Sequence, residues 1–130
     1  MTDDELLAAF EAVTLSPERF GHREHLRVGF ALLVREGDLA CAAVAMRGGL
    51  RRFAAAAGAA AKYHETITWA YLALIAERMH GRGYTSSEQL LADHPDLLDH
   101  RAGALARSYD VAEIARSPLA RAVFVLPTRT

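Results

Sequence analysis

The sequence is poor in the features that mark disulfide-bonded, membrane-spanning and nucleic-acid-binding proteins. It contains a single cysteine, Cys41, so no disulfide can form within the chain, and a reducing cytoplasmic location is expected. No apolar run reaches membrane-spanning length without a charge or a glycine, and the acidic N-terminus lacks the layout of a signal peptide. The net charge of -1 gives no basic footprint for nucleic acid. We therefore expect a cytoplasmic protein that binds neither membranes nor nucleic acid.

Strands and a second domain are also not indicated. At 130 residues the chain has room for one ordinary core, so residues 1–130 are expected to form one domain. Hydrophobic residues make up 52% of the chain and charged residues 24%, which is typical of soluble globular proteins. Alanine is abundant and β-branched residues are sparse, which favours helices. An alanine- and arginine-rich chain with one lysine, Lys62, is typical of a GC-rich bacterium.

Apolar residues recur at spacings of three and four along most of the chain, and this pattern predicts an all-α bundle of five to six helices. The main predicted helices span residues 3–15, 22–36, 39–57, 63–80, 85–93 and 96–108, the last of them slack around Gly103. In the tail, residues 111–116 are expected to be helical, and the apolar run 122–126 to form a final helical turn. Gly48 and Gly49 predict a kink or a close helix contact, and Cys41 is expected to be buried.

Three histidines in two short motifs are the strongest functional signal. His22 and His25 lie in the segment FGHREHL, residues 20–26, and His64 lies in KYHET, residues 62–66. All three fall at positions that the helical pattern turns inward. A buried imidazole needs a hydrogen-bond partner or a ligand, so three inward histidines favour a functional site.

The spacing of His22 and His25 suits metal binding. Residues three apart on a helix lie on one face, about 5–6 Å apart at Cβ. His64 would add a third imidazole if the second and fourth helices are neighbours. Three neutral imidazoles suit a divalent transition metal such as Fe or Zn, with an open position for water or substrate. We therefore predict a metal site formed by these three histidines.

Residues near the third histidine would complete the site. Glu65 is predicted to act as a base or to orient a ligand, although adjacent helical residues point about 100° apart. Tyr63 and Tyr71 supply hydroxyl groups and are predicted catalytic residues. Thr68 and Trp69 are predicted to bind substrate, with the indole as a wall of the pocket.

Motifs of several enzyme classes are absent. The chain has no glycine-rich phosphate loop, no Gly-x-Ser-x-Gly nucleophile elbow and no His-Glu-x-x-His zinc motif. The Glu-x-x-His pairs of a carboxylate di-iron bundle are incomplete. No Cys-x-x-Cys-His motif is present, so haem ligation by the same histidines would have to be non-covalent.

The predicted function is that of a small enzyme acting on a small polar molecule through a bound divalent transition metal. Two alternatives stay open. In the first there is no metal, and His22 and His64 are the acid–base pair of a lyase, isomerase or hydrolase. In the second the protein is a non-catalytic helical module that binds a ligand or partner, and the histidines are structural. The alanine-rich third helix also allows a homodimer.

The two histidine motifs together carry a resemblance. The patterns Phe20-x-His22-x-x-His25 and Tyr63-His64-x-Thr-x-Thr resemble those of a group of small uncharacterised bacterial helical proteins. The likeness covers residues 18–80, with a weaker echo near residues 117–119. The resemblance implies a helical fold and supports the two motifs as one unit, and it implies no activity or substrate.

Overall fold

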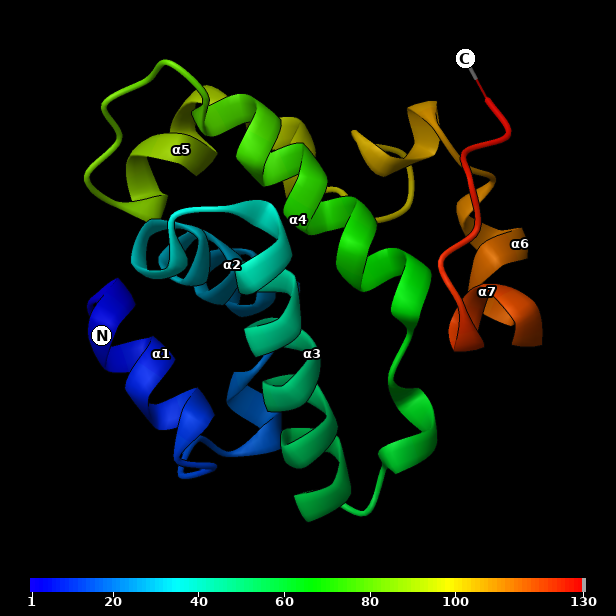
Figure 1. The fold of residues 1–130 in the computed structure, drawn as a ribbon, viewed down its shortest axis with the longest axis horizontal. Coiled ribbons are helices and arrows are strands. Elements are labelled where there is room, and N and C mark those ends of the chain that lie inside the picture. Colours follow the sequence, from blue (N-terminus) through cyan, green and yellow to red (C-terminus); the bar gives the residue numbers. More distant parts are fainter. Residues whose placement is uncertain (130) are drawn as a thin grey trace.

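The protein is built from helices joined by turns and loops. The computed structural model describes residues 1–129, which contain no strand. Its seven α-helices are α1 (Asp3–Glu11), α2 (His22–Glu36), α3 (Leu39–Ala56), α4 (Glu65–Met79), α5 (Ser87–Asp93), α6 (Val111–Arg116) and α7 (Pro118–Ala122) (Figure 1). Short 3-10 turns lie at Pro17–Arg19, Ala60–Lys62, Pro95–Leu97 and Leu105–Arg107. The all-α prediction is confirmed; within the described residues the tail adds two short helices, α6 and α7, to the long ones.

Helix α2 lies at the centre of the molecule. It packs against α1, α3, α4 and α5, and its predicted inward positions Leu26, Gly29, Leu32 and Leu33 are buried. A Cβ atom on Gly29 would lie 3.2 Å from the side chains of both Leu72 and Ile75, so α2 and α4 approach closely here. A hydrophobic cluster draws residues from all seven α-helices onto this centre.

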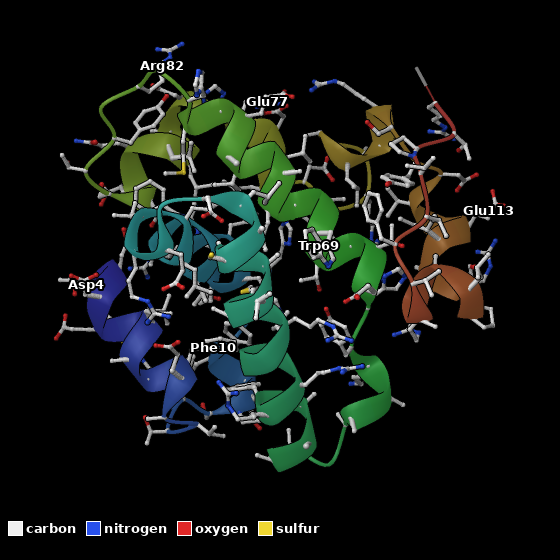
Figure 2. The ribbon with its side chains drawn as sticks, viewed as in Figure 1. Asp4, Phe10, Trp69, Glu77, Arg82 and Glu113 are labelled. Atoms are coloured by element: carbon white, nitrogen blue, oxygen red, sulfur yellow. The ribbon has the colours of Figure 1, made fainter. Side chains whose placement is uncertain are left out.

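The glycine pair of α3 makes a close helix contact. A Cβ atom on Gly49 would lie 2.8 Å from Cζ of Phe10, which is fully buried between α1 and α3 (Figure 2). Gly48 faces only the flexible end of Arg52. The expectation that Cys41 is buried is wrong: it lies exposed in the first turn of α3, where its backbone N–H donates to Asp38.

Two helices are shorter than the periodicity predicts. Helix α1 ends at Glu11 instead of residue 15, because Val13 adopts a left-handed conformation with φ of 57°. Helix α4 begins at Glu65 instead of Tyr63, because His64 is extended and caps the helix with its own ring. A side chain that accepts from a first-turn N–H satisfies a donor that has no partner inside the helix.

The helix predicted over residues 96–108 is absent. In its place are two 3-10 turns joined by a tight turn in which Gly103 N donates to Asp99 O and Ala104 N donates to Asp96 O. A Cβ atom on Gly103 would overlap both of these carbonyl oxygens, so the turn needs glycine. Asp96 fixes the segment in place by accepting two hydrogen bonds from Arg78 of α4, at 2.9 and 3.0 Å, and one from Arg107.

The final helical turn predicted over residues 122–126 is also wrong. Helix α7 ends at Ala122, and the chain then runs extended from Val123. Thr66 in the first turn of α4 holds this tail: its hydroxyl donates to Val123 O at 2.9 Å and accepts from Val125 N at 3.1 Å. A side chain distant in the sequence thus replaces the backbone partners that a helix would supply. No helix between residues 1 and 129 has the length and apolar character needed to cross a membrane.

We predict that Gly49→Ala lowers the free energy of unfolding by about 1–3 kcal/mol, because the new methyl group must displace a buried phenyl ring. Gly48→Ala is the matched control in the same helix. It is expected to raise the free energy of unfolding by about 0.5–1 kcal/mol, since alanine is the better helix former and the neighbouring arginine can move. Urea unfolding of both variants measures this, and equal effects would contradict the close contact.

Candidate functional site

Four of the predicted site residues, His22 and His25 of α2 and Thr68 and Tyr71 of α4, line a cavity of about 460 Å³, which we call the histidine cavity. It lies beside the Gly29 contact, and its walls come from α2, α3, α4 and the segment 100–115. Among residues 1–129, no Asp, Glu, Lys or Arg side chain lines it. Its polar side chains are His22, His25, Thr68, Tyr71 and His100.

His22 lines the cavity and has one ring nitrogen with a free lone pair. Its Nε2 lies 2.8 Å from Leu97 O, and because a carbonyl can only accept, Nε2 carries the hydrogen. Burial lowers the pKa of His22, so the ring is neutral at pH 7 and its Nδ1 holds a lone pair. Within residues 1–129 this is the only hydrogen bond of the side chain. His22 is therefore equipped to accept a proton or to bind a metal.

Tyr71 carries a buried hydroxyl group without a partner. The residue is 8% exposed, and its hydroxyl forms no hydrogen bond with any residue between 1 and 129. The ring stands edge-on to His22, with a centroid distance of 4.9 Å. Burial, with a smaller contribution from the charge of Asp99, raises the pKa of Tyr71 to about 12, so the hydroxyl keeps its proton. A buried polar group of this kind needs a partner from outside the chain.

His25 stands between this cavity and a second hollow. Its Nδ1 lies 2.9 Å from Gly21 O and therefore carries the hydrogen, which leaves the lone pair on Nε2. The ring stacks on Phe20 with a centroid distance of 4.0 Å, and burial lowers its pKa. The second hollow, which we call the outer cavity, measures about 650 Å³ and lies between α3, the start of α4 and Arg121 of α7.

His64 lines the outer cavity with both ring nitrogens engaged. Its Nδ1 accepts from Ile67 N at 3.1 Å as the cap of α4, and its Nε2 lies 2.8 Å from Ile114 O and donates to it. Burial lowers the pKa of His64 and keeps this tautomer neutral. The prediction that His64 binds a metal therefore requires that it give up one of these two bonds.

Of the other predicted site residues, two line a cavity and two line none. Tyr63 lines the outer cavity, and Thr68 lines both cavities. Glu65 lines neither: it accepts from the Tyr63 hydroxyl at 2.5 Å and pairs with Arg47 of α3 at 3.2 Å. Figure 2 shows Trp69 midway along α4, and this half-buried side chain also lines neither cavity.

The side chains around Tyr63 determine the chemistry of its hydroxyl group. Burial, and then the hydrogen bond to Glu65, raise the pKa of Tyr63 to about 12. Arg51 of α3 lies over the tyrosine ring, 5.3 Å from its centroid. These contacts tie the start of α4 to α3, and they direct the Tyr63 hydroxyl and the Glu65 carboxylate toward each other.

His100 is a cavity residue that the periodicity misses. Its ring centroid lies 5.2 Å from that of His22, and it sits in the turn that Gly103 makes possible. Asp99 stabilises this turn by accepting from the backbone N–H groups of Arg101 and Ala102. A histidine in a polar turn has no apolar repeat to indicate its direction, so no signal in the sequence marks it.

No group of three His, Cys, Asp or Glu side chains that could hold a metal ion is found among residues 1–129. Comparisons of the chain with protein-family models, with curated proteins and with solved structures gave no match. The metal site and the resemblance of the histidine motifs therefore stay predictions.

We predict that the free energy of unfolding falls in mild acid, because the fold keeps three histidines neutral. The usual histidine pKa is 6.5, and burial lowers the pKa values of His22, His25 and His64 in the folded protein. Between the two values the unfolded chain binds more protons, so the free energy of unfolding falls as the pH drops below 6.5. Carboxylates such as Asp96, with a usual pKa of 3.8, change the free energy of unfolding only at lower pH.

His64→Asn is expected to reduce this pH dependence. Asparagine can still cap α4 but has no ionisable ring. Urea unfolding between pH 7 and 5 measures the effect, with exposed His80→Asn as the control that leaves the slope unchanged. A slope that is the same in wild type and in His64→Asn would mean that His64 is not held neutral by the fold.

Proposed function

We propose that this protein is an enzyme that moves a proton on a small, largely apolar carbonyl compound bound in the histidine cavity. The observation that carries the proposal is the contact between two rings: Tyr71, whose buried hydroxyl has no partner, and His22, whose Nδ1 has a free lone pair. One group can donate a hydrogen bond and the other can accept a proton, and both line the same cavity. The proposal corresponds to the metal-free alternative from the sequence, in which two side chains form an acid–base pair. Tyr71 takes the place of His64 as the partner of His22.

The roles follow from the protonation states. Tyr71 keeps its proton and donates to the carbonyl oxygen, which polarises the carbonyl and acidifies the neighbouring C–H bond. His22 Nδ1 takes that proton, the C–H electron pair becomes a C=C bond, and the oxygen becomes an enolate held by Tyr71. In a substrate with a β,γ double bond, the proton returns from His22 to the γ-carbon of the dienolate, which completes an isomerisation. In a substrate with a β-substituent, the enolate expels that group with its bonding electron pair and the protonated His22 gives it the proton, which completes an elimination.

The walls of the cavity support a less polar substrate than the sequence predicts. Most of the lining is aliphatic, contributed by Leu26, Met46, Leu50, Ile67 and Leu72 among others. An unpaired charge buried against such walls would be costly, so the part of the substrate that enters is uncharged. Few, well-placed polar groups in an apolar cavity are typical of small-molecule sites.

Tyr71→Phe separates function from folding. Because the hydroxyl has no partner in the chain, we expect the variant to be as stable as wild type within about 1 kcal/mol, or more stable. Proton abstraction should be lost. It is measured by proton NMR in D₂O as deuterium incorporation next to the carbonyl, across a panel of ketones and keto acids, so the complete reaction need not be known.

His22→Asn is the second variant for the same assay, since asparagine has no basic nitrogen, and it should also incorporate no deuterium. Exposed His80→Asn is the control that retains exchange. Exchange that is as fast in Tyr71→Phe and His22→Asn as in wild type would contradict the proposed roles. Ligand binding without exchange in wild type would favour the non-catalytic binding module.

Metal-assisted chemistry is a second candidate function. It is favoured by one observation: His22 and His25 line the same cavity, and each ring has one nitrogen that carries no hydrogen. A divalent transition metal such as Fe or Zn bound there would polarise a substrate oxygen or activate water. Its remaining positions would be open to water and substrate.

Elemental analysis tests the metal. For the metal-assisted function we expect about one ion per chain in tag-free protein purified without chelators, and none in a folded His22→Ala/His25→Ala double variant. His80→Ala, which removes an exposed histidine, is the control and should keep the ion. Absence of metal from wild type, even after addition of Fe(II), Zn, Mn, Co, Ni and Cu salts, would rule this mechanism out.

A further inference from the structure

The histidine cavity and the outer cavity lie side by side. They share six lining residues: Phe20, His25, Leu50, Ile67, Thr68 and Ala115. A ligand long enough to pass His25 and Thr68 would contact both cavities. The shared walls are mainly apolar, so the connecting part of such a ligand is a hydrocarbon chain or ring.

The two ends of the site differ in charge. The histidine cavity has no charged lining among residues 1–129, whereas the outer cavity is lined by Lys62, Arg121 and Glu18. Neither cation forms an ion pair with a carboxylate of the described chain. Two positive charges against one negative charge leave the outer cavity with a net charge of about +1.

Arg121 is a half-buried cation held only by carbonyl dipoles. Its Nη1 donates to Lys62 O at 3.0 Å and its Nη2 donates to Ala115 O at 3.0 Å. These bonds fix the guanidinium at the wall of the outer cavity without neutralising it. A charge withdrawn from water in this way is stabilised by a counter-ion, and the chain supplies none to it.

We infer that the substrate is an amphiphilic monocarboxylate, with its carbonyl group in the histidine cavity and its carboxylate in the outer cavity beside Lys62 and Arg121. The inference rests on the proposed function and names its substrate class. A net charge of +1 matches a carboxylate better than a dianionic phosphate. An apolar body joins the two groups and lies along the shared walls.

Isothermal titration calorimetry at neutral pH and low salt tests the inference with defined probes. The probes are methyl-keto acids of seven, nine and eleven carbons, which vary the distance between the ketone and the carboxylate. Each is compared with its methyl ester, which lacks the charge, and with the saturated acid of equal length, which lacks the ketone. The first comparison reports on the carboxylate end and the second on the carbonyl end.

We expect at least one keto acid to bind about tenfold more tightly than its ester, a preference that an ion pair with the half-buried Arg121, strengthened by the exposed Lys62, can supply. Lys62→Gln should reduce this preference at least threefold and leave binding of the ester unchanged. Tyr71→Phe should instead remove the preference for the keto acid over the saturated acid. Arg82→Gln is the matched control, since this exposed arginine lies beyond the opposite end of α4 (Figure 2).

Three results would overturn the inference. They are equal binding of acid and ester, equal loss of both in Lys62→Gln, and no binding of any acid by folded wild type. Circular dichroism establishes that each variant is folded. If the ester binds as well as the acid and Tyr71→Phe weakens both, the carboxylate site is wrong and the proposed carbonyl site stands. Deuterium exchange then decides the proposed function independently.

Discussion

The close approach of α2 to α4 at Gly29 is the constraint on which the site depends. The absent side chain lets the backbone of α2 come against Leu72 and Ile75, and Gly29, Leu72 and Ile75 all line the histidine cavity. His22 lies two turns before Gly29 on the same face of α2, and Tyr71 lies one turn before Ile75 on the facing side of α4. The close packing at this glycine thus brings His22 and Tyr71, the proposed base and acid, together from two different helices.

Backbone carbonyls determine what each histidine can do. His22 donates from Nε2 to Leu97 O, and His25 donates from Nδ1 to Gly21 O, so each keeps one ring nitrogen with a free lone pair. His64 also donates to a carbonyl, but its second nitrogen accepts from the N-terminus of α4. The three imidazoles therefore differ in whether a ring nitrogen is free to bind a ligand or a proton, because the hydrogen bonds of each ring fix which nitrogen is left.

The sequence predicts the helices better than it predicts the site. Period and spacing locate α2, α3 and α4 and turn His22 and His25 inward, because those patterns arise from burial along one helix. They do not predict the turn around Gly103, whose need for glycine comes from the carbonyl of Asp96, or the tail held by Thr66. Contacts between residues distant along the chain leave no periodic trace.

The same limit applies to the chemistry. Neighbouring residues such as His64 and Glu65 suggest a shared site in the sequence, yet the helix start separates them: the ring caps α4 and the carboxylate pairs with Arg47 of α3. His22 and Tyr71 are far apart in the sequence, and only helix packing brings their rings to a centroid distance of 4.9 Å. A phenylalanine at position 71 would fill the same space without leaving a buried hydroxyl unpaired, and so would suit folding better. The hydroxyl finds no hydrogen-bond partner within residues 1–129, and this is why the proposed function gives it the task of binding the substrate carbonyl.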